Sequence, residues 1–509
     1  MNLSGRFRPT RAGRLSGGDV MAGVTVALVL LPQSLAYAEL AGLPAVRGLY
    51  AAAAACLAAA FFASSPYLQT GPVALTALLT LGSLGHLARP GSGRYIGLAA
   101  LLALVVGVIR LGLGLLRLGG FAYMMSEPVV MGFSTGAALV ILATQLPTAL
   151  GAAPDGGIFP SAFSALAHPD RWDAASVTLA TITLVIMVGG RRVHPMFPGV
   201  LLAVVAATAW SVLIHYDGPT LGEVHGGLPP ATLDLPYSRL PDLLIPGMII
   251  AVVGFAEAIS IARRYATMER QVWDPSQELV GQGLANLAAG AGGGFPVGGS
   301  FSRTALNHLA GARTRWSGAV TGVVVVLLVP FTPVLSALPR AVLAAVVIGA
   351  VRSLVQIGPF AELWRYSRAQ FSIGLITFGL TLALAPRVGH AVLVGILLAV
   401  AVHLRREILI SVPSWTEDDA VHLKPKGVLY FGSVASLERT FMAILHDHPE
   451  ARRLVVHLDG LGRVDVTGAL ALSSLLAEAE EAGLSACVVE VPPQAARIVA
   501  RVLDGRWGV

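Results

Sequence analysis

The chain has 509 residues, of which 55% are hydrophobic and only 13% are charged, and its mean hydropathy is +0.72. A soluble globular protein carries roughly 25% charged residues, so a chain of this composition cannot cover a water-exposed surface and is an integral membrane protein. Its formal net charge of +6 is no sign of nucleic-acid binding, because the basic residues stand at the ends of apolar runs, where they orient membrane spans.

The N-terminal segment, residues 1–18, carries four arginines before the chain turns apolar at Val20. Excess Lys and Arg stays on the cytoplasmic side, so we expect a cytoplasmic N-terminus. Residues 19–406 contain about fourteen apolar runs of roughly the length that crosses a bilayer, which predicts a transmembrane domain. The runs begin near Asp19, Arg47, Thr70, Ile96, Tyr123, Ala174, Pro195, Leu243, Glu278, Phe301, Ser317, Arg340, Ser367 and Val388.

The arginines support this orientation. If each run crosses once, most of them fall in cytoplasmic connections, and the outer connections are poorer in basic residues. Two outer connections are long, Pro147–Asp173 and His215–Asp242. This excess of arginine in cytoplasmic connections predicts an even number of spans with both termini cytoplasmic. A number of spans that differs by two would fit equally well, because it has the same parity.

Glycine and proline interrupt two of the runs at corresponding positions in the two halves of the domain. The first break, in SSPYLQTGPVALTALLTLG, contains Gly71-Pro72, and the second, in FPVGGSFSRTALNHLAG, contains Pro296 before Phe301. Transporters built from inverted repeats carry such broken helices at their binding sites. The extended residues at each break cannot face lipid, because their backbone groups need partners, so they are buried in protein or line a cavity.

The two breaks predict an anion site. Each places a helix N-terminus, with its partial positive charge and free N–H groups, near the middle of the membrane. Ser300 or Ser302 can cap the second short helix, and Arg303 in its first turn adds a full positive charge. Helix breaks also serve packing alone, and a channel pore could use the same helix ends.

Two acidic residues are candidates for proton coupling. Glu257, in GFAEAISIA, lies well inside an apolar run, where an unpaired carboxylate can take up and release a proton, or can pair with Arg303 as a fixed part of the structure. Glu39 lies near the outer end of the first span, and a hydrated interfacial role competes there with a coupling role. Glu127 stands at a helix start, where it stabilises the helix N-terminus.

Residues 415–509 have ordinary polarity and predict a small cytoplasmic α/β domain. VLYFGS, RRLVVHLDG and LSACVVEVP are expected to form strands, and Ser436–His446 and Thr467–Gly483 are expected to form helices. We expect Thr467 to cap its helix; phosphorylation of its hydroxyl is the alternative.

The sequence predicts no enzyme, no metal site and no cofactor. Its two cysteines, Cys56 and Cys487, lie far apart and provide neither a disulfide framework nor a metal cluster. No nucleophile–base arrangement, phosphate-binding loop or metal-ligand spacing is evident in the sequence.

The motifs LPQSLAYAELAGLPAVRGLYAA, QTGPVALTALL, EAISIARRYA and GAGGGFPVGGSFSRTALN resemble, in this order, segments of the SulP anion permeases, the family of the sulfate permeases, pendrin and prestin. The tail from about Asp418 is similar to the STAS domain that follows them. The resemblance implies a bacterial-type member with fourteen spans arranged as a seven-plus-seven inverted repeat. It further implies a core domain that moves like an elevator against a gate domain, and a homodimer.

The resemblance also implies where the anion binds, between the short helices of the third and tenth spans. Gln33 and Tyr37 of the first span are assigned to the site by the resemblance alone, although their spacing sets them on one helical face. The other residues that match the family's site are Pro72, Val73, Phe301, Ser302 and Arg303.

From residues and resemblance together, we expect a secondary active anion transporter in the cell inner membrane, with protons and a small anion as its partners. Acidic residues in the membrane favour proton-coupled uptake of a small, fumarate-like dicarboxylate. Sulfate or bicarbonate symport or exchange is the alternative. A passive anion channel and a sensor that does not transport also stay open.

Overall fold

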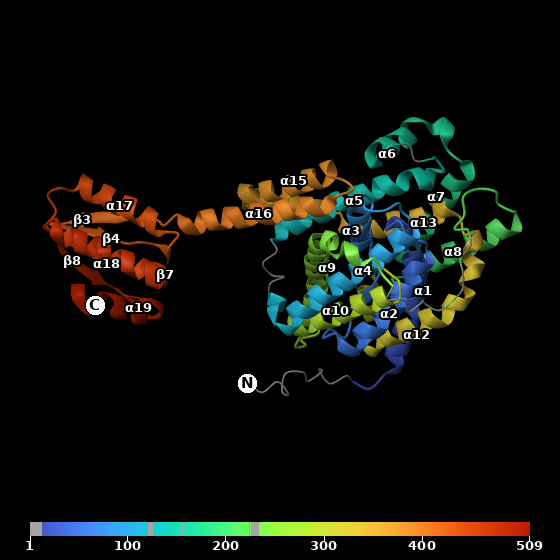
Figure 1. The fold of residues 1–509 in the computed structure, drawn as a ribbon, viewed down its shortest axis with the longest axis horizontal. Coiled ribbons are helices and arrows are strands. Elements are labelled where there is room, and N and C mark those ends of the chain that lie inside the picture. The colour runs from blue at the N-terminus through green and yellow to red at the C-terminus, as the bar shows by residue number, and fades with distance from the viewer. Residues whose placement is uncertain are drawn as a thin grey trace. The chain divides into compact units, whose positions relative to one another are not determined.

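The computed structural model describes residues 13–508 except 121–125, 154–155, 223, 225–226 and 228–233. The chain forms two compact units, Met1–Ile396 and Leu397–Val509. The first is built of helices with one pair of two-residue strands, and the second of strands and helices (Figure 1). Each unit has a hydrophobic core of its own.

Each of the fourteen predicted apolar runs contains a helix. In the described part of the chain, seven helices are long and apolar enough to cross a membrane. They are α1 (Gly17–Leu40), α4 (Gly93–Leu115), α5 (Glu127–Leu150), α7 (Ala174–Val193), α9 (Leu240–Met268), α12 (Trp316–Leu328, continued by a 3-10 turn) and α16 (Val388–Ile408). The other runs contain α2 (Val46–Phe62), α3 (Ala74–Leu84), α8 (Gly199–Leu213), α10 (Pro275–Ala291), α11 (Phe301–Leu309), α13 (Arg340–Val351) and α15 (Arg368–Ala383).

Two further helices, α6 (Ile158–Ala167) and α14 (Ile357–Tyr366), lie outside the predicted runs. Within the long connection expected over Pro147–Asp173, α5 extends to Leu150 and α6 forms the middle part. Both α6 and α14 have 10 residues. A bilayer crossing needs about 20, so a search for span-length apolar runs passes over them.

Small residues bring α10 close to its neighbours α2 and α4. A Cβ atom added at Gly107 of α4 would lie 2.8 Å from the backbone nitrogen of Leu287, and one added at Gly283 would lie 2.6 Å from that of Leu111. Glycine at such positions lets membrane helices approach closely, where side-chain packing and hydrogen bonds can hold them. The close approach fixes α10, whose polar side chains support the functional site described below.

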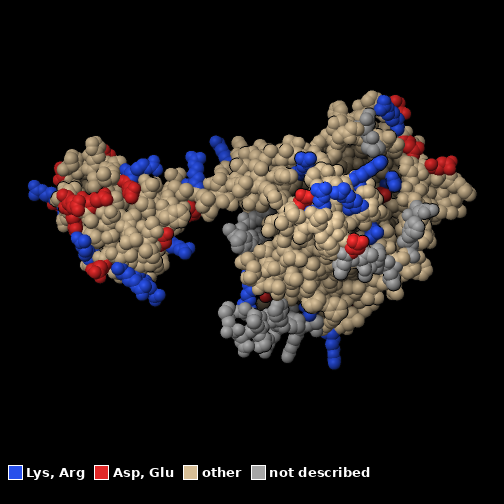
Figure 2. All heavy atoms as spheres, viewed as in Figure 1, with Lys and Arg blue, Asp and Glu red and all other residues tan. Residues whose placement is uncertain are grey.

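The second unit contains a four-stranded sheet in the order β3 (Ser414–Glu417), β4 (Ala420–Leu423), β6 (Arg453–His457) and β8 (Ser485–Val489). The pair β3–β4 is antiparallel and the pairs β4–β6 and β6–β8 are parallel. A parallel pair, β5 (Gly427–Leu429) and β7 (Leu461–Val464), and three helices, α17 (Val434–Asp447), α18 (Val466–Glu481) and α19 (Pro493–Leu503), complete it. Charged side chains are spread over this unit, whereas the visible face of the helical unit is mostly without them (Figure 2).

The α/β character of the tail agrees with the expectation, but the predicted helix cap was wrong. Asp465 is the N-cap of α18, and its side chain accepts a hydrogen bond of 2.7 Å from the N–H of Gly468. Thr467 lies inside the first turn and is exposed. An aspartate is at least as good an N-cap as a threonine, and it stands where the strand ends and the helix begins.

Candidate functional site

The two breaks meet in the structure. β1 (Thr70–Gly71) pairs with β2 (Gly298–Gly299) in an antiparallel ribbon, which places Thr70 opposite Gly299 and Gly71 opposite Gly298. The short helices α3 and α11 begin just after these strands. The ribbon thus brings two helix N-termini together, as the anion-site prediction required.

Side chains satisfy the backbone of the extended segments around this ribbon. Asn286 of α10 binds both backbone groups of Val297: its Oδ1 accepts from the N–H at 3.0 Å and its Nδ2 donates to the carbonyl at 3.2 Å. Glu278 of the same helix accepts from the N–H groups of Ser64 and Ser65 at 3.1 and 2.8 Å. These bonds meet the requirement that non-helical backbone inside a membrane be satisfied by protein.

Arg303 lies at the centre of the site. Ser300 is the N-cap of α11 and accepts from the N–H of Arg303 at 3.4 Å. The Arg303 side chain donates from Nη1 to Oε1 of Gln33 at 3.2 Å and from Nη2 to the carbonyl oxygen of Pro72 at 2.8 Å. The residue is 1% exposed, and its Nε is buried without a hydrogen-bond partner among the described residues. Both groups that Arg303 binds are neutral, so its charge is not compensated by them.

The remaining predicted residues surround this centre. Tyr37 is buried in α1, four residues after Gln33, and Val73 is the N-cap of α3. Phe301 lines one cavity and Ser302 lines another. The second cavity has a volume of about 260 Å³ and also contains Arg191 of α7. The first turn of α11 therefore contributes to two cavities.

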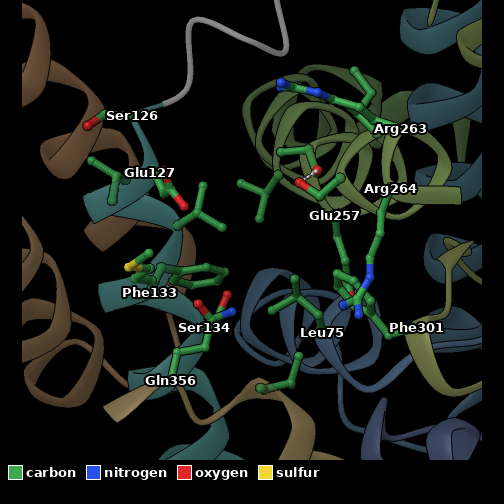
Figure 3. A pocket seen from close by; sticks show the side chains of 18 of the residues that line it. Leu75, Ser126, Glu127, Phe133, Ser134, Glu257, Arg263, Arg264, Phe301 and Gln356 are labelled. Carbon is green, nitrogen blue, oxygen red and sulfur yellow. Dashed lines mark hydrogen bonds between the residues drawn. The ribbon is translucent and has the colours of Figure 1, made fainter. Parts of the chain in front are cut away.

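The larger cavity, of about 790 Å³, holds Glu257 (Figure 3). Glu257 and Arg264 project from α9 on one side, and Phe133 and Ser134 of α5 lie on the other. The cavity is also lined by Leu75, Glu127, Arg263, Phe301 and Gln356. Arg263 and Arg264 are among the arginines that indicate the orientation of the chain, but the sequence did not predict them, Ser134 or Gln356 as cavity residues. No spacing rule connects α5 or Gln356 with α9, so the sequence held no signal for them.

The two candidate coupling residues have different surroundings. Among the described residues, no cation lies within 4.0 Å of the Glu257 carboxylate, and Arg303 is not its ion-pair partner. Glu39 at the end of α1 lies 3.6 Å from Nε of Arg340, the first residue of α13, and the two side chains are 27% and 50% exposed. The structure therefore brings Gln33, Pro72 and Arg303 into direct contact and sets Glu39 in a separate, partly exposed ion pair.

The arrangement is suited to binding a small anion. Two helix N-termini and a buried arginine supply positive potential, and a carboxylate lies in the adjoining cavity. In the described part of the chain, no cluster of three or more His, Cys, Asp or Glu residues could hold a metal ion.

The chain is similar to several known proteins. Residues 17–377 match the sulfate permease family, and residues 414–502 match the STAS domain. Sulfate transporter 4.1, chloroplastic, of Arabidopsis thaliana is 35% identical over 397 residues, which cover 76% of this chain and 58% of that protein. The chain thus spans less than two thirds of the length of this relative.

Two solved structures have similar folds. Murine solute carrier 26 family member A9, in an inward-facing state, aligns with a TM-score of 0.86 at 20% identity and covers 98% of this chain and 88% of its own. The transmembrane domain of the cyanobacterial bicarbonate transporter BicA aligns with a TM-score of 0.64 at 26% identity, over 75% of this chain and 97% of its own. The predicted fold class, a polytopic helical membrane protein followed by a STAS domain, is confirmed.

Proposed function

This chain belongs to the sulfate permease family, and we propose that it is an anion transporter that carries out secondary active, proton-coupled uptake of a small dicarboxylate. Members of the family are transporters and not enzymes. The relatives reported above are named for sulfate and for bicarbonate. Sulfate or bicarbonate transport is therefore the second candidate.

One observation carries the proposal for the anion. Arg303 is buried at the N-terminus of α11, its Nε has no partner, and the groups that it binds, Gln33 and the Pro72 carbonyl, are neutral. A buried cation with no carboxylate within ion-pair distance is costly, and a bound anion would offset that cost. A carboxylate or sulfate oxygen can accept from guanidinium N–H groups and from the free N–H groups of a helix start. The site residues of the proposal are Gln33, Tyr37, Pro72, Val73, Phe301, Ser302 and Arg303.

The proton is assigned to Glu257. This carboxylate lines the cavity beside Phe301 and has no cation within 4.0 Å among the described residues. A carboxylate in such a place can be neutral when the proton is carried and charged when it is released. Glu39 is the second candidate, and its ion pair with Arg340 is the competing explanation for that residue.

We further propose an elevator mechanism in a homodimer within a bacterial inner membrane, with both termini cytoplasmic. The transport domain would extend over residues 19–406, after a cytoplasmic segment 1–18, and the STAS domain over 415–509. The pairing of broken helices from the two halves supports a rigid core that carries the anion as one body.

Uptake into liposomes tests the proposal. The purified protein would be given labelled fumarate, sulfate, bicarbonate or chloride, with and without an inward proton gradient. We expect gradient-driven accumulation of fumarate. Accumulation of sulfate or bicarbonate instead would identify the second candidate, and equilibration of several anions regardless of the gradient would indicate an exchanger or a channel.

Alanine variants of two arginines, one buried in the site and one exposed outside it, provide a test and its matched control. Arg303→Ala is expected to abolish uptake, whereas Arg313→Ala removes an exposed arginine from the loop after α11 and should leave it intact. Both proteins must elute as folded particles. Normal uptake by a folded Arg303→Ala protein would contradict the assignment of the site.

A further inference from the structure

We infer that Arg110, on α4, is a second buried cation of the anion site and positions the segment that leads into α11. Arg110 acts on the anion through its charge and through the backbone that it holds, without touching the anion. The inference rests on the proposed function, because it assigns a role in binding an anion beside Arg303.

The contacts of Arg110 join three parts of the fold. Its side chain is fully buried, at 0% exposure. Nε donates to the carbonyl oxygen of Ala251 at 3.1 Å and Nη2 to that of Ile250 at 3.0 Å, both in α9. Nη1 donates to the carbonyl oxygen of Val297, just before β2, at 3.0 Å. One side chain of α4 therefore links the helix that bears Glu257 to the segment that ends at Arg303.

The ribbon relates Arg110 to Arg303. The ribbon sets Thr70 opposite Gly299 and Gly71 opposite Gly298, so Pro72, which follows Gly71, and Val297, which precedes Gly298, flank the same end of the ribbon. Arg303 donates to the carbonyl of Pro72, and Arg110 donates to the carbonyl of Val297. Two arginines from different halves of the domain thus donate to backbone carbonyls at the same end of the ribbon. One carbonyl lies next to each strand, close to the start of α3.

The guanidinium of Arg110 is closely packed against α9. A Cβ atom at Gly254 of α9 would lie 2.5 Å from Nη2 of Arg110, so that glycine makes the space. Asn286 also donates to the Val297 carbonyl, which is held from two sides. A planar guanidinium matches three carbonyls in a fixed fork, whereas a lysine ammonium is a compact point charge.

The charge of Arg110 is left uncompensated by protein. Among the described residues, no carboxylate oxygen lies within 4.0 Å of a nitrogen of Arg110 or Arg303, and all the acceptors of Arg110 are neutral carbonyls. Two such cations flanking one ribbon raise the positive potential at the helix starts. Since Coulomb energy is proportional to the charge of each partner, the second cation favours a divalent anion over a monovalent one.

The test compares sulfate with chloride on the full-length protein in detergent. The rise of the thermal midpoint with anion concentration would be fitted to obtain the concentration of each anion that half-fills the site, its apparent dissociation constant, for the unmodified protein, Arg110→Gln and Arg110→Lys. In Arg110→Gln we expect this concentration to rise about tenfold for sulfate and roughly threefold for chloride, because halving the ligand charge halves the lost energy. Arg110→Lys should keep the preference for sulfate. Arg117→Gln, which changes an exposed arginine just after the end of α4, should change neither value.

Each outcome decides a separate point. Equal changes for sulfate and chloride in Arg110→Gln would mean that Arg110 only supports the fold and would overturn the inference alone. No anion effect in the unmodified protein would overturn the proposed function as well. If Arg110→Gln does not fold, Arg110→Lys decides: loss of the preference for sulfate although the charge is kept would contradict the electrostatic role.

Discussion

Three buried or half-buried carboxylates of the helical unit differ in what they bind. Asp19 accepts from the N–H groups of Arg313 and Thr314, each at 2.8 Å, and Glu278 accepts from those of Ser64 and Ser65. Both of these carboxylates hydrogen-bond to backbone N–H groups and so hold the backbone in place. Glu257 has no such bond among the described residues and lines the cavity. At the scale of single residues, Glu257 is therefore the acid whose protonation need not disturb the fold.

Glu257→Gln removes the titratable group but keeps its shape and one hydrogen-bonding oxygen. We expect uptake to lose its response to the proton gradient, so that the ratio of rates with and without an inward gradient falls to about one. Proton-gradient dependence of labelled-anion uptake in liposomes measures this. Glu127→Gln, which alters an exposed carboxylate of the same cavity, is the control and should keep the response. An unchanged response in Glu257→Gln would leave Glu257 with a structural role.

Glu39→Gln is expected to have the smaller effect of the two carboxylate variants. Its partner Arg340 is half-exposed, and pairs of that kind contribute about 0–1 kcal/mol. The thermal midpoint should therefore move little and the gradient response should persist. A gradient response lost in Glu39→Gln but kept in Arg340→Gln would assign proton coupling to Glu39 itself.

At the scale of elements, the two strands of the ribbon differ in how much space they leave for an added side chain. A Cβ atom at Gly299 would lie 2.9 Å from Cδ1 of Leu68 and 3.2 Å from Cα of Ala258, the neighbour of Glu257. One at Gly71 would lie 3.5 Å from Nη2 of Arg303 at the closest, which is ordinary contact. The second strand is therefore packed against α9 more tightly than the first strand is against Arg303.

Gly299→Ala should destabilise the protein by about 1–3 kcal/mol, the usual cost of forcing extra atoms into a packed interior, and should slow uptake. Gly71→Ala should cost less, because its added methyl group meets no backbone atom within 4 Å. Thermal unfolding and initial uptake rates of the two variants, measured side by side, check the difference. A larger loss in Gly71→Ala than in Gly299→Ala would contradict this account of the ribbon.

Asp173, the N-cap of α7, makes helix stability depend on pH. The Ser176 hydroxyl and the Ser176 N–H, at 2.8 Å, donate to its carboxylate and lower the pKa of Asp173. A lowered pKa in the folded state gives stability that is present above the ordinary value of about 4 and is lost as the pH falls through the folded-state pKa.

Asp173→Ala should therefore lose about 1 kcal/mol at neutral pH, and the difference from the unmodified protein should shrink below about pH 4. Thermal midpoints measured over a pH series report it. Asp170→Ala removes a nearby exposed carboxylate that caps no helix and serves as the control. A difference that stays constant down to low pH would show that the carboxylate charge does not contribute.

The sequence predicts elements better than contacts in this protein. Apolar runs mark the spans, and Gly71-Pro72 and Pro296 mark the breaks, because lipid permits so few backbone conformations. Arg303 stands out as a charge in the first turn after a break. The bond from Arg303 to Gln33 joins residues 270 positions apart, so only the family resemblance connected them. Arg110 was not predicted as a functional residue, because the sequence around a lone arginine in a span does not indicate that its side chain hydrogen-bonds to carbonyl groups of α9.

At the scale of the whole molecule, the two units have separate hydrophobic cores. The core of the helical unit is formed by residues from Leu35 to Val392, and that of the STAS unit by residues from Ile410 to Trp507. Every residue assigned to the anion site or to proton coupling lies between Gln33 and Arg303. The proposed chemistry of transport therefore uses no side chain from the STAS unit.

A chain that stops after Ile408, the last residue of α16, should fold and retain part of its uptake. Its hydrophobic core and all proposed site residues are intact, and it lacks only strands and helices that pack among themselves. Labelled-anion uptake in liposomes, compared with full-length Arg303→Ala as the inactive reference, measures the residual rate. The removed part, residues 409–509, should fold alone and show the circular dichroism of a mixed α/β protein. A truncated protein that elutes as a folded particle but takes up no more anion than Arg303→Ala would mean that the STAS unit is required for the transport cycle itself, and the site as drawn from α1, α3, α9 and α11 would then be incomplete.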